Sequence, residues 1–96
     1  MEVIQVTSAT TGTIVINDTG QDVHLIHDAS TTLTMIVNFP ATPVNGQILV
    51  IASAGGITTL TLSSSSTITG TLSSLVVGGS GKYQYLTTNN KWYKIN

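Results

Sequence analysis

The sequence predicts an all-β fold, and within that class an antiparallel β-sandwich of jelly-roll type with eight to ten short strands. Thr, Val and Ile dominate, apolar residues alternate with Thr or Ser, and turn residues recur at short intervals. No segment shows the three-to-four-residue apolar period of a capped amphipathic helix. Two antiparallel sheets packed face to face would bury one side of each strand in a single domain spanning residues 1–96.

The first half of the chain holds four expected strands, each bounded by turn residues. Asp18-Thr19-Gly20 ends the second strand, and Pro40 and Pro43 punctuate the connection after the fourth. In the fourth strand, Leu33 shares a face with Met35 and Val37, so we expect it in the core and expect Leu33→Asp to abolish soluble protein. These four strands are Val3–Thr7, Thr13–Asn17, Asp22–His27 and Thr32–Phe39.

The second half begins with Asn45-Gly46, the strongest two-residue turn signal in the chain. The continuous apolar run Ile48–Ile51 that follows suits a strand covered on both faces. Thr-Leu-Ser-Ser occurs twice, but one echo does not indicate a solenoid, which needs at least three repeats. The remaining strands are expected at Gln47–Ala52, Ile57–Leu62, Thr67–Thr69, Leu72–Val77, Lys82–Leu86 and Lys91–Ile95. The predicted core comprises Ile14, Ile16, Leu33, Met35, Val37, Ile48, Val50, Leu60, Leu62, Tyr83 and Tyr85.

The end of the chain, from Gly78 to Asn96, holds the only Trp, all three Tyr and all three Lys. It reads as a β-hairpin with a polar turn at Thr87–Asn90, and we expect its aromatic residues to close the core. Strict alternation places Trp92 and Lys94 on one face and Tyr93 on the other. We expect the aromatic residues to fill the core and its rim, which leaves at most one face of the hairpin, the Trp92 side, available to a ligand.

Small size and weak charge together point to assembly. A 96-residue chain has a modest core, and the absence of Cys excludes disulfide bonds. Only 7% of the residues are charged, where about 25% is typical, so a Thr-rich surface tends to pair with itself. The net charge of −1 gives no nucleic-acid footprint, and no apolar run is long enough to span a membrane. The four acidic residues all precede the three lysines along the chain. This separation would bring the two ends of the chain, or two subunits, together, unless it reflects chance and the charges stay solvated.

No arrangement of residues indicates an enzyme, a metal site or a cofactor site. His24 and His27 lie three apart in an expected strand and therefore point to opposite faces, which makes them a poor metal pair. The four carboxylates give no acid–base pair, and no Ser lies in a nucleophile elbow. The sequence 78–81 (Gly-Gly-Ser-Gly) precedes a strand rather than a helix, which indicates a turn and not a phosphate cradle. The residues that remain as interface or ligand contacts are Trp92, Tyr93, Lys94 and His24.

Three motifs resemble a module of tailed-bacteriophage virion proteins. They are the Asn45-Gly46-Gln47 strand start, the alternating strand at 57–62 (Ile-Thr-Thr-Leu-Thr-Leu), and the closing hairpin with Tyr83-Gln84-Tyr85 and Trp92-Tyr93-Lys94-Ile95. The resemblance covers roughly residues 32–96 and carries over no catalytic residue. It implies a β-rich, usually trimeric building block of a capsid or fibre.

The resemblance implies a structural virion protein, made in the host cytoplasm and active on the virion. The chain has no room for long shaft segments, which favours a homotrimeric capsid decoration, or cement, protein that binds the major capsid protein or another virion protein. Residues 1–30 match less well and are a possible docking segment or arm. The alternative is a tail-fibre or receptor-binding module that contacts host glycans through Trp92 and Tyr93.

Overall fold

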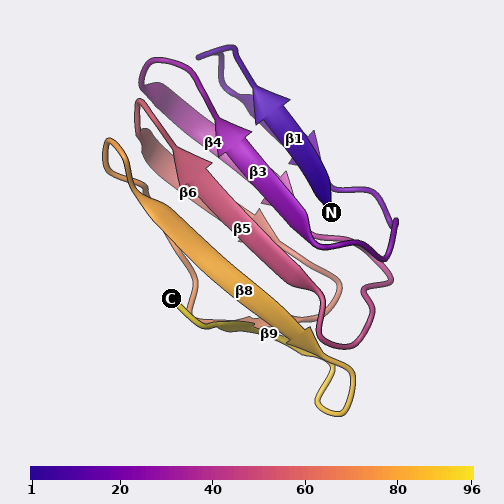
Figure 1. The fold of residues 1–96 in the computed structure, drawn as a ribbon. Helices are drawn as coiled ribbons and strands as arrows, with labels where there is room; N and C mark the ends of the chain where they lie inside the picture. The colour runs from indigo at the N-terminus through magenta and orange to yellow at the C-terminus, as the bar shows by residue number, and fades with distance from the viewer.

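A computed structural model describes residues 1–96 as nine β-strands in two sheets with no helix (Figure 1). The all-β prediction and the predicted number of strands are confirmed. The strands are β1 (Glu2–Val6), β2 (Gly12–Val15), β3 (Val23–His27), β4 (Thr32–Asn38), β5 (Ile48–Ser53), β6 (Ile57–Ser63), β7 (Thr67–Thr69), β8 (Ser80–Leu86) and β9 (Lys91–Lys94).

The predicted antiparallel jelly roll is wrong, because the first six strands form three parallel coils. From β1 to β6 the chain passes alternately between a six-stranded sheet, ordered β1-β3-β5-β8-β9-β7, and a three-stranded sheet, ordered β2-β4-β6, and β7–β9 then stay in the larger sheet. In the first sheet β1, β3 and β5 pair in parallel, and in the second β2, β4 and β6 do the same. Each pair of successive strands therefore makes one turn of a short β-solenoid, and the core lies between the sheets (Figure 1).

The coils have unequal lengths, which hides them in the sequence. Val23 pairs with Glu2 in the preceding coil and with Leu49 in the following one, and the stretch from Val23 to Leu49 is the longer of the two. In the other sheet Met35 pairs with Gly12 and with Leu60, again at unequal separations along the chain. The coils have the same backbone course but different sequences. A search for sequence repeats therefore finds only the two copies of Thr-Leu-Ser-Ser, which do not correspond to the coils.

The predicted C-terminal β-hairpin is confirmed, and it closes one end of the solenoid. Strands β8 and β9 are antiparallel, and the turn between them places Asn90 in the left-handed region with φ of 53°. The hairpin continues the six-stranded sheet beyond β5, and its last strand also pairs with β7. Trp92 packs edge-on against Phe39 with ring centroids 5.1 Å apart and lies 5.3 Å from Tyr85. Such contacts stabilise a small core by about 0.5–1.5 kcal/mol each beyond burial.

The predicted core is confirmed at six positions and wrong at three. The other two predicted positions, Ile14 and Leu62, are only partly buried and pack against the core from its margin. Leu33 is 70% exposed, and Ile48 and Val50 point away from the core, which takes their neighbours Leu49 and Ile51 instead. The confirmed positions are Ile16, Met35, Val37, Leu60, Tyr83 and Tyr85.

Leu33 is exposed because β4 and β6 bend at the same level. Thr32 and Met35 both face inward, with two residues between them instead of the single residue of a regular strand. Leu33 therefore points to solvent, although strict alternation would place it on the same side as Met35. In β6, Ile57 and Leu60 are both buried with exposed Thr58 and Thr59 between them, in register with the bend of β4. Because the bends of β4 and β6 are in register, the two neighbouring coils keep their parallel pairing through the bend.

The turns stack closely as well. A Cβ on Gly55 would overlap the backbone of Ala29 and Ser30 in the turn of the preceding coil, so this position requires glycine. The strand predicted at Leu72–Val77 is instead irregular and makes a single bridge, between Leu75 and Ile57. This segment lies along β6 and covers part of its free edge.

Candidate assembly surface

The outer face of the six-stranded sheet is the surface opposite the core. Alternation puts Leu25, Leu49 and Tyr83 inward, and the residues between them outward. The pairing register aligns the outward side chains in rows across β1, β3, β5 and β8. One row is Val3, His24, Val50 and Lys82, the next is Gln5, Ile26, Ala52 and Ser80, and a third holds Ile48 and Gln84.

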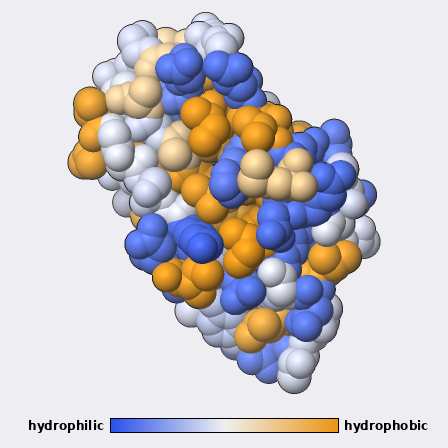
Figure 2. Space-filling model, viewed as in Figure 1, coloured by the Kyte–Doolittle hydropathy of each residue, from blue (hydrophilic) through white to orange (hydrophobic).

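The centre of this outer face is apolar. Ile26, Ile48, Val50 and Ala52 are half-buried by their neighbours on the sheet, and no part of the chain lies over them. Figure 2 shows apolar atoms gathered along the middle of this side of the molecule, over β3 and β5, between hydrophilic side chains. Strand β5 is thus apolar on both sides, while the chain covers only the inner one.

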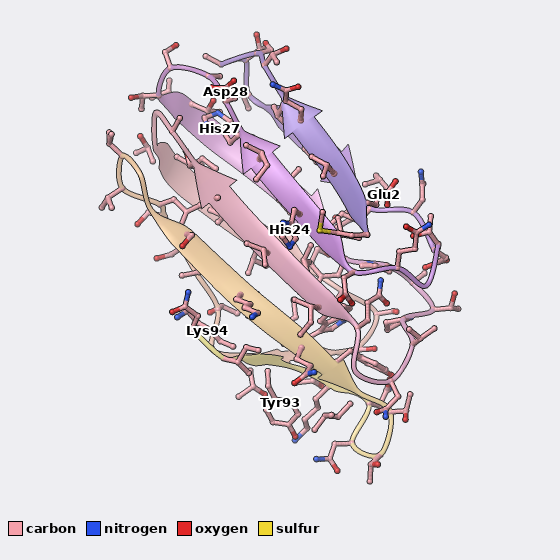
Figure 3. The ribbon with its side chains drawn as sticks, in the orientation of Figure 1. Glu2, His24, His27, Asp28, Tyr93 and Lys94 are labelled. Carbon is pink, nitrogen blue, oxygen red and sulfur yellow. The ribbon has the colours of Figure 1, made fainter.

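Charges of opposite sign flank the apolar centre. Asp22 and Asp28 continue the outward positions of β3 at its two ends, and Gln5 Nε2 donates to Asp28 Oδ2 at 3.4 Å. Lys82 is outward on β8, two strands away from His24. Glu2 and Asp28 lie on the β1–β3 side of the sheet and Lys94 on the β8–β9 side (Figure 3). On the outer face itself, the carboxylates of Asp22 and Asp28 at the two ends of β3 are separated from Lys82 on β8.

The structure places two of the four predicted contact residues on this sheet's outer side. His24 is in the first row, and Tyr93 pairs with Gln84 and faces outward from β9. Lys94 is exposed but points to the opposite side of the sheet from Tyr93. The aliphatic part of its side chain packs against Gly70, where a Cβ would clash with it. Trp92 is fully buried, so the expectation that its side of the hairpin is open to a ligand is wrong. Lys91–Ile95 has large residues on both faces, and its sequence alone does not say which face turns inward.

His27, the other member of the histidine pair, is fully buried as well. Its Nδ1 lies 2.8 Å from Ser53 Oγ and its Nε2 lies 2.7 Å from Thr32 Oγ1. Ser53 Oγ also accepts a hydrogen bond from the backbone N–H of Gly56 at 2.8 Å. These bonds join β3, β4 and β5 where the chain crosses between the sheets. The predicted opposite orientation of His24 and His27 is confirmed.

This buried group has the residue types of a nucleophile and base but not their setting. Ser53 is 3% exposed and His27 has no exposed surface, so a substrate has no access to either. The second ring nitrogen of His27 faces the Thr32 hydroxyl instead of a carboxylate. The group therefore serves to fix the crossing between coils, because hydroxyls satisfy both nitrogens in either tautomer. The sequence contains a signal for the burial of His27, because in a regular strand this residue lies on the same face as the apolar Val23 and Leu25.

A shallow hollow of about 250 Å³ lies beside the turn at Gly55 and Gly56. Its walls include Leu75, Val76 and Val77, and it contains no titratable side chain. Nowhere in the chain do three or more His, Cys, Asp or Glu residues come together in a group able to hold a metal ion. The structure contains no helix with the length and apolarity needed to cross a membrane.

No family model, curated protein or solved structure matches this chain.

Proposed function

We propose that this chain is a structural protein that acts by assembling, and that its assembly is the virion of a tailed bacteriophage. The strongest form of the proposal is a homotrimeric decoration protein that binds the capsid shell and stabilises it. The resemblance of the strand motifs and the closing hairpin supports the virion setting. The apolar outer face of β3 and β5 supports an assembling subunit, and this is the observation on which the proposal rests.

The observed face has the composition of an interface centre. Large apolar side chains surrounded by polar ones and left uncovered are typical of surfaces that bind another protein. The outer face places Ile26, Ile48 and Val50 together, with Gln84 and Lys82 beside them. A subunit that binds only the folded shell stabilises that shell by mass action.

Capsid binding tests this proposal. Purified chain is incubated with emptied capsids of the phage that encodes it, the capsids are sedimented, and their thermal disruption is followed by light scattering. We expect the chain to sediment with the capsids and to raise their disruption temperature. A chain that stays in the supernatant and leaves the disruption temperature unchanged contradicts the decoration role.

The alternative, a fibre module that binds glycans, has weaker support. Of its two aromatic candidates, Trp92 has no exposed surface. Tyr93 remains partly exposed, and its hydroxyl accepts a hydrogen bond from Asn89 Nδ2 at 2.7 Å. Glycan binding that disappears in Tyr93→Ala while the fold persists would favour the fibre module.

A further inference from the structure

We infer that the outer face of the six-stranded sheet is the surface through which copies of this chain bind one another. This inference rests on the proposed self-association and says which residues carry it. The contact is centred on Val50 and Ile48 of β5 and on Ile26 of β3, with Lys82 and Asp28 at its two sides.

Strand β5 lies inside the sheet, between β3 and β8, and has apolar residues on both sides. Leu49 and Ile51 fill the core, so the folding of one chain explains them. Ile48 and Val50 lie on the opposite side of the strand and contribute nothing to that core, so core packing does not explain their apolar character. A sheet with one solvated face normally alternates apolar with polar residues. The apolar outer positions of β5 are explained when a second copy covers them.

The charges on the outer face are arranged so that two copies complement each other. The acidic residues Asp22 and Asp28 lie on the β3 side of the apolar centre, and Lys82 lies on its β8 side. The β3 side of one copy therefore complements the β8 side of the next, whereas like sides repel one another. A head-to-tail contact of this kind closes into a ring when the rotation permits, and three copies make the smallest such ring beyond a dimer.

The size of the face determines how the association should be measured. Four strands about 4.8 Å apart and five residues long at about 3.4 Å each cover roughly 300 Å² of flat footprint. Stable interfaces usually bury about 800 Å² of accessible surface per partner. The contact therefore depends on the additional area of the projecting side chains and on closure of a ring. Because a contact of this size is weak, we expect the average molecular mass to fall on dilution.

The test compares matched substitutions on the two sheets by light scattering over a dilution series. Val50→Asp places a carboxylate at the centre of the outer face, and Leu33→Asp places one on an exposed position of the other sheet. Val50→Thr keeps the branched shape and serves if Val50→Asp does not fold, as judged by circular dichroism. We expect the Val50 variants to raise the dissociation midpoint about tenfold or more, and Leu33→Asp to match the unsubstituted chain.

A second pair tests the charges. Lys82→Glu reverses the charge on the outer face, and Lys94→Glu reverses one that points the other way from β9. We expect Lys82→Glu to weaken association several-fold at low salt and less at high salt, with Lys94→Glu close to the unsubstituted chain.

The outcomes separate the failure of this inference from that of the proposed function. An unsubstituted chain that stays monomeric at every concentration overturns both the inference and the proposed trimer. If the chain forms an oligomer and none of Val50→Asp, Val50→Thr and Lys82→Glu weakens it, copies do not bind through the outer face. That result overturns the inference and leaves the proposed trimer unaffected. A Val50 variant that loses capsid binding while self-association is unchanged also overturns the inference, because the face then binds the shell.

Discussion

At the scale of single residues, buried polar side chains show how the coils are joined. His27 makes hydrogen bonds of 2.8 and 2.7 Å to hydroxyls on two other strands, with no exposed surface. A buried network of this kind is favourable only while every member has a partner. Loss of the ring leaves the hydroxyls of Ser53 and Thr32 without their partner and opens a cavity.

We therefore expect His27→Ala to lower the free energy of unfolding by about 2–4 kcal/mol. His24→Ala is the matched control, because His24 lies on the same strand but on the outer face. At concentrations where the chain is monomeric, it should change stability by less than about 0.5 kcal/mol. Equal effects in urea denaturation would show that the buried network adds nothing to stability.

Tyr83 links the fold to alkaline pH. Burial raises the pKa of the Tyr83 hydroxyl above 10.0, while a backbone hydrogen bond from Leu72 acts in the opposite direction. The hydroxyl also donates to the carbonyl of Gly70 at 2.6 Å. Because the unfolded chain releases this proton at lower pH than the folded chain, stability is fully present below pH 10 and falls as the pH rises above it.

Urea denaturation from pH 8 to pH 11 measures this linkage. We expect the unfolding midpoint of the native sequence to fall above pH 10, and that of Tyr83→Phe to fall less steeply from a lower starting value, because it lacks the hydrogen bond to Gly70. Parallel pH profiles for the two proteins would contradict the assignment to Tyr83.

At the scale of elements, β4 shows where alternation fails. Its bend exposes Leu33 and buries Met35, which a regular strand would place on the same face. Leu33→Asp should therefore give soluble protein that melts cooperatively within about 0.5 kcal/mol of the unsubstituted stability. Met35→Asp should give insoluble or unfolded protein, because it buries an unpaired carboxylate. Thermal melts that rank the two variants the other way would show that the bend is misplaced.

The closing hairpin makes the second prediction at this scale. Trp92 lies at the centre of the aromatic cluster, and its Nε1 is buried without a hydrogen-bond partner. Trp92→Ala should lower the free energy of unfolding by about 3–5 kcal/mol. We expect Trp92→Phe to cost less, because it keeps an aromatic ring and removes the unpaired donor. Tyr93→Ala is the control, and calorimetry that shows equal losses in all three variants would contradict the central position of Trp92.

At the scale of the whole molecule, the sequence predicts the strands far better than their partners. Alternation and turn residues locate all nine strands near their observed bounds, since both are local signals, and they add only the strand at Leu72–Val77 that does not form. Pairing depends on contacts between residues far apart along the chain, and nothing local distinguishes a parallel coil from an antiparallel hairpin. The hairpin β8–β9 is the exception, because its short turn forces antiparallel neighbours.

The same distinction holds for the candidate surface. The opposite orientation of His24 and His27 follows from strand parity, and the apolar run Ile48–Ile51 suggests a strand with two covered sides. Which side faces the core depends on the register with β3 and β8, which the run itself does not contain. The same ambiguity in β9 explains why the sequence places Trp92 on the open side, whereas the structure buries it.

The first and last coils also differ at this scale. The hairpin and the segment around Leu75 cover the C-terminal end of the solenoid, whereas β1 and β2 each have one neighbour only. Free edges of this kind usually carry features that limit further pairing. The residues proposed as a docking segment form these two edge strands and β3.

The mass of the purified chain in solution, measured by light scattering over a dilution series, tests the central claim most directly. We expect a species with three times the 10.0 kDa mass of one copy, which dissociates on dilution. A constant mass of one copy at all concentrations would contradict the claim that this small, weakly charged chain functions by assembling with itself.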